Sequence, residues 1–234
     1  MRKLFTILLA CFTSAVTAQI TYSEGLNGRV LRVQDINGKS LIKEKYDGEI
    51  EGTPFLNNDW SDADLLLSQG KQIKKVKANL NIESNELYIK DSADKVLVIQ
   101  DFVVNEITFT SRSVSNQEGM TFRNGYPPVD KQSVTFFYQV LADGKIQLLK
   151  KMSKTIDVKK NELSGEVSKE FVENSQYYIL SNKGMENFKY QKEFIMDFLK
   201  DKQVAVDDYV KANKTNFKKI PDVQKLLTYY NGLK

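Results

Sequence analysis

The hydrophobic pattern of this sequence changes its period once, near Lys189, and this change constrains the fold more than any other feature. Over residues 21–180, apolar residues alternate with polar ones in short runs, as in antiparallel strands. After Lys189, apolar residues recur at helical spacing. We therefore predict a mainly β protein (α+β). An antiparallel sheet, as a partly open barrel or a sandwich, would occupy residues 19–188, with a C-terminal helical subdomain over 189–234 packed on it.

Within the first region, clusters of Asn, Asp, Ser and Gly separate the alternating runs and supply turns. The clearest hairpin joins residues 134–141 to residues 146–150 through Ala142-Asp143-Gly144-Lys145. The same spacing predicts an antiparallel meander with further strands at residues 29–36, 40–42, 65–67, 73–76, 80–82, 87–89, 96–99, 102–109 and 177–180.

Three helices are predicted in the last part of the chain. Pro221 and Asp222 mark the beginning of the third, because proline and acidic residues are favoured in the first turn of a helix. We expect the apolar faces of all three to pack on the sheet. These faces consist of Phe194, Ile195, Phe198 and Leu199 in the first helix, Val206, Tyr209 and Val210 in the second, and Val223, Leu226, Leu227 and Tyr230 in the third.

The alternating pattern lapses between Thr110 and Ser133. This stretch contains Gly119, Asn124-Gly125 and Pro127-Pro128, with a few aromatic residues among polar ones. It is predicted to be a long loop, and long loops in compact domains are typically functional or disordered.

The N-terminus has the features of a cleavable secretory signal peptide over residues 1–18. Arg2 and Lys3 precede an apolar run from residue 4 to residue 16, and small residues follow before polar sequence begins. Cleavage is expected between Ala18 and Gln19, which places the mature protein in the periplasm or outside the cell.

Two alternatives to cleavage after Ala18 concern the membrane. A retained transmembrane anchor would need about 20 consecutive apolar residues, more than this run provides. The stretch Leu8-Leu9-Ala10-Cys11 resembles a loose lipobox, in which Cys11 would be lipidated and become the mature N-terminus. The protein would then be anchored to a membrane through Cys11. The mass of the mature chain distinguishes the two outcomes.

Composition excludes several kinds of chemistry. Cys11 is the only cysteine and the chain has no histidine, so removal of the signal peptide would leave neither thiol nor imidazole. Ser-His-Asp and Cys-His catalysis are therefore excluded, as are metal or haem sites that depend on those ligands. The sequence nominates no catalytic residue, metal ligand or cofactor. The formal net charge of +4, to which Arg2 and Lys3 contribute, is too small to indicate a nucleic-acid partner.

Several short motifs resemble segments of exported β-rich proteins of unknown function from the Bacteroidota. The resemblance implies a cell-envelope protein and brings no activity or site residues with it. It is carried by Gly52-Thr53-Pro54-Phe55-Leu56-Asn57-Asn58-Asp59-Trp60, by Phe137-Tyr138-Gln139-Val140-Leu141 with Asp143-Gly144-Lys145 and Leu148-Leu149-Lys150-Lys151, and by Tyr229-Tyr230-Asn231.

Two places in the sequence are candidate binding sites. Trp60 follows the Asx cluster of residues 57–59, which could form a calcium loop or a carbohydrate contact, although the spacing of an EF-hand loop is absent. Phe122 and Tyr126 lie in the long loop and could present aromatic rings to a partner. The structural alternatives are a core tryptophan and a loop whose aromatic residues pack back onto the sheet.

The leading hypothesis is a non-enzymatic binding or structural module of the cell envelope that contacts another envelope protein or a glycan. The alternative is a carboxylate-dependent hydrolase acting on glycans, which needs two acidic groups roughly 5 to 10 Å apart across a cleft. Facing acidic residues in a deep cleft would favour the enzyme. A shallow groove or an exposed apolar patch would favour binding.

Overall fold

The computed structural model describes residues 30–32, 50–110, 119–160, 162 and 165–233. The predicted signal peptide, its cleavage residues Ala18 and Gln19, Cys11 and the strand predicted at residues 40–42 lie outside this range. The strand predicted at residues 29–36 is described only at Val30–Arg32.

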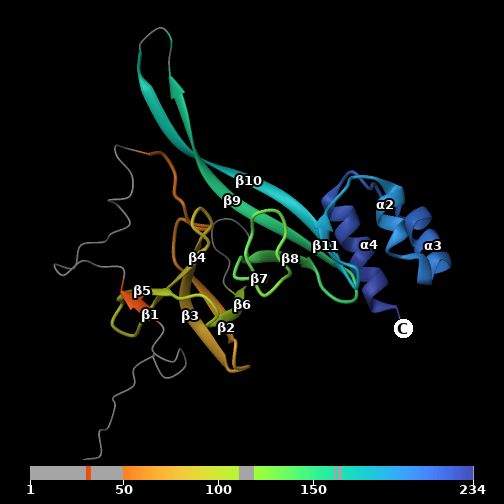
Figure 1. Cartoon of the computed structure of the whole chain (residues 1–234), viewed down its shortest axis with the longest axis horizontal. Coiled ribbons are helices and arrows are strands. Elements are labelled where there is room, and N and C mark those ends of the chain that lie inside the picture. Colours follow the sequence, from red (N-terminus) through yellow and green to blue (C-terminus); the bar gives the residue numbers. More distant parts are fainter. Residues whose placement is uncertain (1–29, 33–49, 111–118, 161, 163–164, 234) are drawn as a thin grey trace, which may run out of the picture.

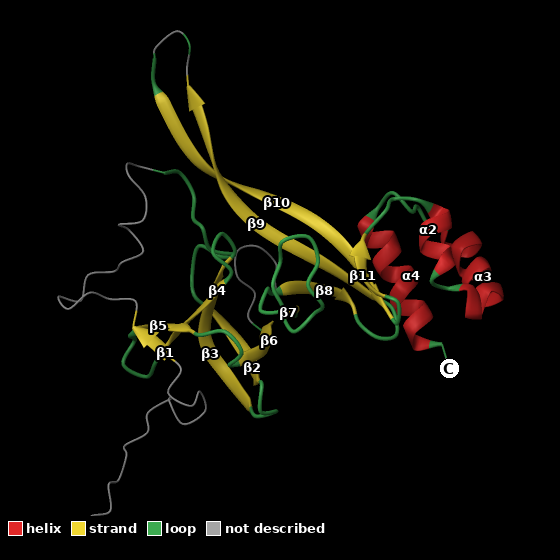
Figure 2. Ribbon diagram, in the orientation of Figure 1, coloured by secondary structure: helices red, strands yellow, loops and turns green. Residues whose placement is uncertain are grey.

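The described strands form one open antiparallel sheet of eleven strands, which confirms the predicted fold class (Figures 1 and 2). The order across the sheet is β1-β5-β4-β3-β2-β6-β7-β8-β9-β10-β11, so that most neighbours are also consecutive in sequence. The strands are β1 (Val30–Arg32), β2 (Ser61–Leu67), β3 (Gln72–Asn81), β4 (Glu86–Lys90), β5 (Val96–Ile99), β6 (Val104–Phe109), β7 (Met120–Arg123), β8 (Tyr138–Ala142), β9 (Gln147–Lys160), β10 (Val167–Ser181) and β11 (Gly184–Asn187).

The sheet curls on itself and does not stack into two layers. β3 and β9 are far apart in the strand order, yet the N–H of Lys154 donates to the carbonyl of Ile82 at the end of β3. The amide side chain of Asn85 accepts from the N–H of Phe137 in the same region. The curl encloses the first hydrophobic core, which includes Leu65, Val76, Leu80, Ile89, Ile107, Phe109, Phe122 and Met152.

Two further cores lie on opposite faces of β8, β9 and β10. Successive residues of a strand point to opposite faces. Leu148 therefore belongs to the core beneath the helices, whereas Leu149 belongs to a core of tyrosines on the other face. The same alternation separates Ile179 from Tyr178 on β10. Both faces of this part of the sheet are thus covered.

The helical subdomain contains the three predicted helices, α2 (Lys192–Asp197), α3 (Gln203–Asn213) and α4 (Ile220–Gly232), with the short 3₁₀ helix η2 (Lys200–Lys202) between α2 and α3. As predicted, Pro221 lies in the first turn of α4. The residues expected on its inner face are buried, namely Val223, Leu226, Leu227 and Tyr230. The helices lie at the end of the sheet formed by β8, β9 and β11 (Figure 1).

β9 and β10 are much longer than the predicted strands at residues 146–150 and 177–180. They pair from Gln147↔Leu180 to Lys160↔Val167 and extend beyond the rest of the sheet as a two-stranded arm (Figure 2). We call residues 153–160 and 167–174 the arm. Their many lysine, acidic and hydroxyl side chains hid the alternation, because both faces of a protruding ribbon are largely exposed to solvent and need few apolar residues.

The stretch predicted as a loop between Thr110 and Ser133 contains a strand. β7 pairs with β6 through Ile107↔Phe122 and with β8 through Phe122↔Gln139. The loop prediction was therefore wrong for Met120–Arg123. This strand has only four residues between turn-forming segments, too few to show an alternating pattern on their own.

Candidate functional site

The segment around Trp60 is held to β3 by hydrogen bonds of buried side chains. The N–H of Asn57 donates to the side chain of Asn79, whose amide donates back to the carbonyl of Asn57 over 2.8 Å. The Asn57 side chain also contacts Ser61. Trp60 is half-buried, with the ammonium of Lys90 5.3 Å from its ring centre. No group of three or more acidic, histidine or cysteine residues within the described ranges is placed to hold a metal ion.

The other two candidate residues are buried. Phe122 is 1% exposed and packs edge-on against Phe109 in the first core. Tyr126 is 6% exposed, and its hydroxyl donates to the Gln147 side chain over 3.0 Å. Side chains so enclosed present almost no surface to a partner, which favours the structural alternative for Phe122 and Tyr126. They belong to different cores, and the aromatic residues of this stretch pack back onto the sheet.

The tyrosine core is closed by Asp130. This carboxylate accepts hydrogen bonds from the hydroxyl of Tyr178 over 2.8 Å and from the amides of Gln176 and Asn187. These donors hold the pKa of Asp130 below its usual range, with the Tyr178 bond the largest cause. Beside it, burial raises the pKa of Tyr138 to about 12, and the Tyr138 hydroxyl has no hydrogen-bond partner within the described ranges.

The hairpin between β8 and β9 is fastened to the end of α4. The side-chain amide of Asn231 donates to the carbonyls of Asp143 and Ile146, over 2.9 and 2.7 Å, and its oxygen accepts from the N–H of Ile146. Gly144 lies directly against Asn231. Two motifs of the resemblance, Asp143-Gly144-Lys145 and Tyr229-Tyr230-Asn231, therefore meet here. We call this contact the Asn231 plug.

The acidic residues near the plug are paired with basic ones. Arg123 binds Asp143 through two nitrogens and also contacts Glu106. The hydrogen bond from Arg123 lowers the pKa of Asp143. Asp201 accepts from Lys145 and from the hydroxyl of Tyr230, and these bonds lower the pKa of Asp201 in the same way. A general acid in glycoside hydrolysis needs the opposite shift.

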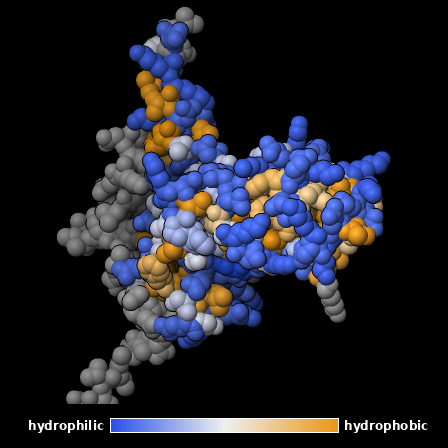
Figure 3. Space-filling view, turned by 45° about the vertical axis from the view of Figure 1, so that its right-hand side comes forward, coloured by the Kyte–Doolittle hydropathy of each residue, from blue (hydrophilic) through white to orange (hydrophobic). Residues whose placement is uncertain are grey.

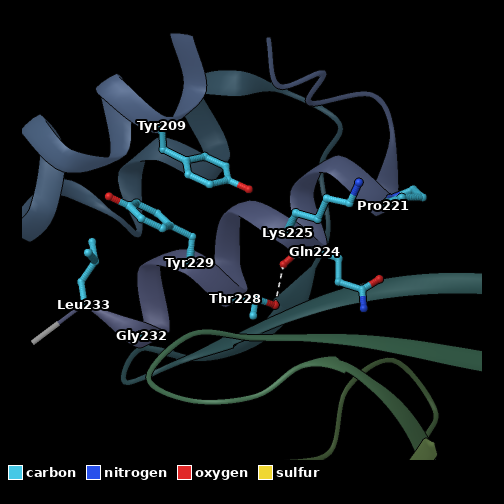
Figure 4. Close-up of a pocket in the computed structure, with 8 residues that line it drawn as sticks. All are labelled: Tyr209, Pro221, Gln224, Lys225, Thr228, Tyr229, Gly232 and Leu233. Atoms are coloured by element: carbon cyan, nitrogen blue, oxygen red, sulfur yellow. Dashed lines mark hydrogen bonds between the residues drawn. The ribbon is translucent and has the colours of Figure 1, made fainter. Parts of the chain in front are cut away.

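A groove between α3 and α4 has a volume of about 630 Å³. Figure 4 shows the rings of Tyr209 and Tyr229 stacked directly against each other at the groove, with 4.4 Å between ring centres and 21° between ring planes. The groove is lined by Tyr209, Pro221, Gln224, Lys225, Thr228, Tyr229, Gly232 and Leu233, a set without an acidic residue.

The helical repeat explains why these residues share the groove. The buried residues of α4 occupy one face of the helix, and the lining residues recur every three or four positions on the adjacent face. Thr228 donates to the backbone carbonyl of Gln224 over 2.9 Å, which holds its side chain along the helix (Figure 4). Gln224 and Lys225 also line the groove, and Figure 4 shows their side chains diverging from α4.

Sequence reasoning did not find this groove. In the sequence, Tyr209 lies on an apolar helix face and Tyr229 stands within the Tyr229-Tyr230-Asn231 motif. One signal was available, because Tyr229 falls outside the 223, 226, 227, 230 spacing that defines the buried face of its helix.

Comparisons with known proteins return no match: no family model matches the chain, and neither a curated protein nor a solved structure is detectably similar to it. In the part of the chain that the structure describes, no helix has the length and apolar character needed to cross a bilayer.

Proposed function

We propose that the protein is a non-enzymatic binding module of the cell envelope and that the groove between α3 and α4 holds a glycan. The observation that carries the proposal is the stacked Tyr209–Tyr229 pair in an open groove. Binding sites combine apolar walls with a few placed polar groups. A sugar ring has an apolar face of C–H groups, which fits against an aromatic ring, and a rim of hydroxyls.

The polar groups of the groove suit that ligand. The Gln224 amide can both donate to and accept from a sugar hydroxyl, and the Thr228 oxygen can accept. Lys225 supplies a positive charge, so a glycan that carries a carboxylate would bind more tightly than a neutral one. The groove has no acidic lining residue that could protonate a glycosidic bond, which is why binding is proposed and not hydrolysis.

The envelope part of the proposal rests on the N-terminal sequence and on the resemblance to exported proteins. When the full-length chain is expressed in a Gram-negative host, we expect a periplasmic product that begins at Gln19. Intact-mass measurement of that product checks this. A membrane-bound product whose mass includes acyl chains on Cys11 would instead identify a lipoprotein, and a cytoplasmic product that retains residues 1–18 would contradict export.

The groove is tested by affinity electrophoresis in native gels that contain soluble polysaccharides, together with co-sedimentation with purified peptidoglycan. We expect at least one of these glycans to retain the protein. Tyr209→Ala and Tyr229→Ala should each weaken that retention about tenfold or more, because each removes one ring of the stack. Stacking of a nucleobase on an aromatic ring is worth about 1–3 kcal/mol, and we expect a contribution of the same order for a sugar face.

Tyr190→Ala is the matched control. Tyr190 is 45% exposed and packs against Phe188, outside the groove, so its replacement should leave retention unchanged. Circular dichroism of each variant verifies that the fold is intact. The glycan proposal fails if no polysaccharide retains the wild-type protein, or if Tyr190→Ala weakens retention as much as the groove variants do.

A further inference from the structure

One edge of the arm, formed by the outer half of β9, is not covered by another strand in the described part of the sheet. β8 pairs with β9 only as far as Lys150, and the N–H of Lys154 is taken by Ile82. The ammonium of Lys154 donates to the carbonyls of Thr53 and Phe55 and fixes the base of the arm to the body. Among the residues that the structure describes, β9 continues beyond this point to Lys160 with β10 on one side only.

The direction of the backbone groups on this edge follows from the pairing on the other side of the arm. Glu51 bonds to Lys169 and Phe171 of β10, so the N–H and C=O groups of those two residues point away from β9. In an antiparallel pair, residues opposite each other either both point inward or both point outward. Ile156 and Val158, which lie opposite Phe171 and Lys169, therefore point their backbone groups outward, and Lys160 follows two residues on.

The side chains beside this edge are exposed and partly apolar. Val158 is 57% exposed and Val167 52%, and Ile156 lies on the same face of the ribbon. Figure 3 shows apolar side chains on the arm, which points upward in that view. Sheet proteins usually blunt such an edge with charge or cover it. Here the edge carries Asp157 and Lys159, which are exposed although Lys159 also pairs with Glu170 of β10 in its own chain. Their charges are opposite and lie two residues apart, so they complement those of a second, antiparallel copy.

We propose that two copies of this chain pair antiparallel through the β9 edges of their arms, with Val158 opposite Val158 of the second copy. This register places Asp157 opposite Lys159 of the second copy, and Lys159 opposite its Asp157. The outward-facing groups of Ile156, Val158 and Lys160 then bond to those of the second copy. The surface proposed here is separate from the glycan groove, and neither proposal depends on the other.

The charges are what identify a second copy as the occupant. Opposite charges directly across an antiparallel pair stabilise it and like charges destabilise it. A two-fold axis at Val158 converts the Asp157-Val158-Lys159 sequence into two such favourable pairs. On the face of the ribbon opposite these charges, the same axis brings the exposed Val158 side chains of both arms together. An axis at Ile156 would instead place Val158 of the second copy opposite Lys154. The Lys154 ammonium already donates to the carbonyls of Thr53 and Phe55.

Two charge reversals test this register in the full chain. D157K and K159D each place like charges opposite each other twice in a symmetric pair, so each variant alone should associate about tenfold more weakly than wild type. An equimolar mixture of the two restores both opposite-charge pairs and should associate as wild type does. Sedimentation velocity over a concentration series, on protein purified after expression of the full-length sequence, measures all four cases.

Both residues are more than half exposed, and far-UV circular dichroism checks that each variant folds. Lys183→Asp is the control and should leave association unchanged, because the ion pair of Lys183 joins the turn between β10 and β11 to Asp197 of α2, away from the arm. The proposal is overturned if wild type remains monomeric at 100 µM or above, or if association survives both reversals. A mixture no better associated than its components would also overturn it.

Discussion

Gly144→Ala is expected to lower the free energy of unfolding by about 3–5 kcal/mol. Gly144 has φ +133°, a conformation that residues with a side chain rarely adopt, and an added Cβ would lie 2.6 Å from Cγ of Asn231. The clash would push Asn231 away and break its bonds to Asp143 and Ile146. Urea unfolding followed by circular dichroism measures the loss.

Gly184→Ala separates the cost of the backbone conformation from the cost of the clash with Asn231. Gly184 has φ +109° but no atom within 4 Å of the added Cβ, so its replacement should cost only about 1 kcal/mol of backbone strain. Asn231→Ala gives a second comparison, since Gly144→Ala should cost much less in that background if the clash is with Asn231. Equal losses for Gly144→Ala and Gly184→Ala would show that the clash with Asn231 adds nothing to the loss of stability.

Phe122→Ala is expected to cost about 3–5 kcal/mol of stability, as truncation of a buried aromatic side chain does. Phe122 is 1% exposed and its ring centre is 5.9 Å from that of Phe109, an edge-on contact that is lost with it. Thermal and urea unfolding measure the change. Glycan retention at a temperature where the variant is folded should equal that of wild type.

Phe102→Ala is the control for this prediction. Phe102 is 58% exposed, and replacement of an exposed residue changes stability by at most about 0.5 kcal/mol in most cases. If Phe122→Ala unfolds as wild type does but abolishes glycan retention, Phe122 is a binding residue and its assignment to the core is wrong.

The parts of the fold that could be predicted are those in which apolar residues mark the buried positions of an element. Short apolar runs between turn-forming residues located β4 and β5, and the spacing of Val223, Leu226, Leu227 and Tyr230 located α4. β7 was missed because four residues cannot display a period. The outer halves of β9 and β10 were missed because the arm has no core beneath it, so nothing required apolar residues there.

The groove could not be predicted because it depends on how two helices lie against each other. Tyr209 and Tyr229 are 20 positions apart, and nothing in either helix alone says that their rings stack. Trp60 and Phe122 stand out in the sequence because they are aromatic residues near turns. Their surroundings, the hydrogen bonds at Asn57 and a core at Phe109, are fixed by strands distant in the chain.

The Asn231 plug also sets an order of events during synthesis. A ribosome makes a protein from its N-terminus, and the strands of this sheet pair mostly with their neighbours in sequence, so each hairpin can close soon after it is made. The turn between β8 and β9 is different, because the side chain that satisfies its carbonyls is added 85 residues later. An interrupted or shortened chain would carry a complete sheet with an open turn, a difference that a protease could use to tell finished molecules from unfinished ones.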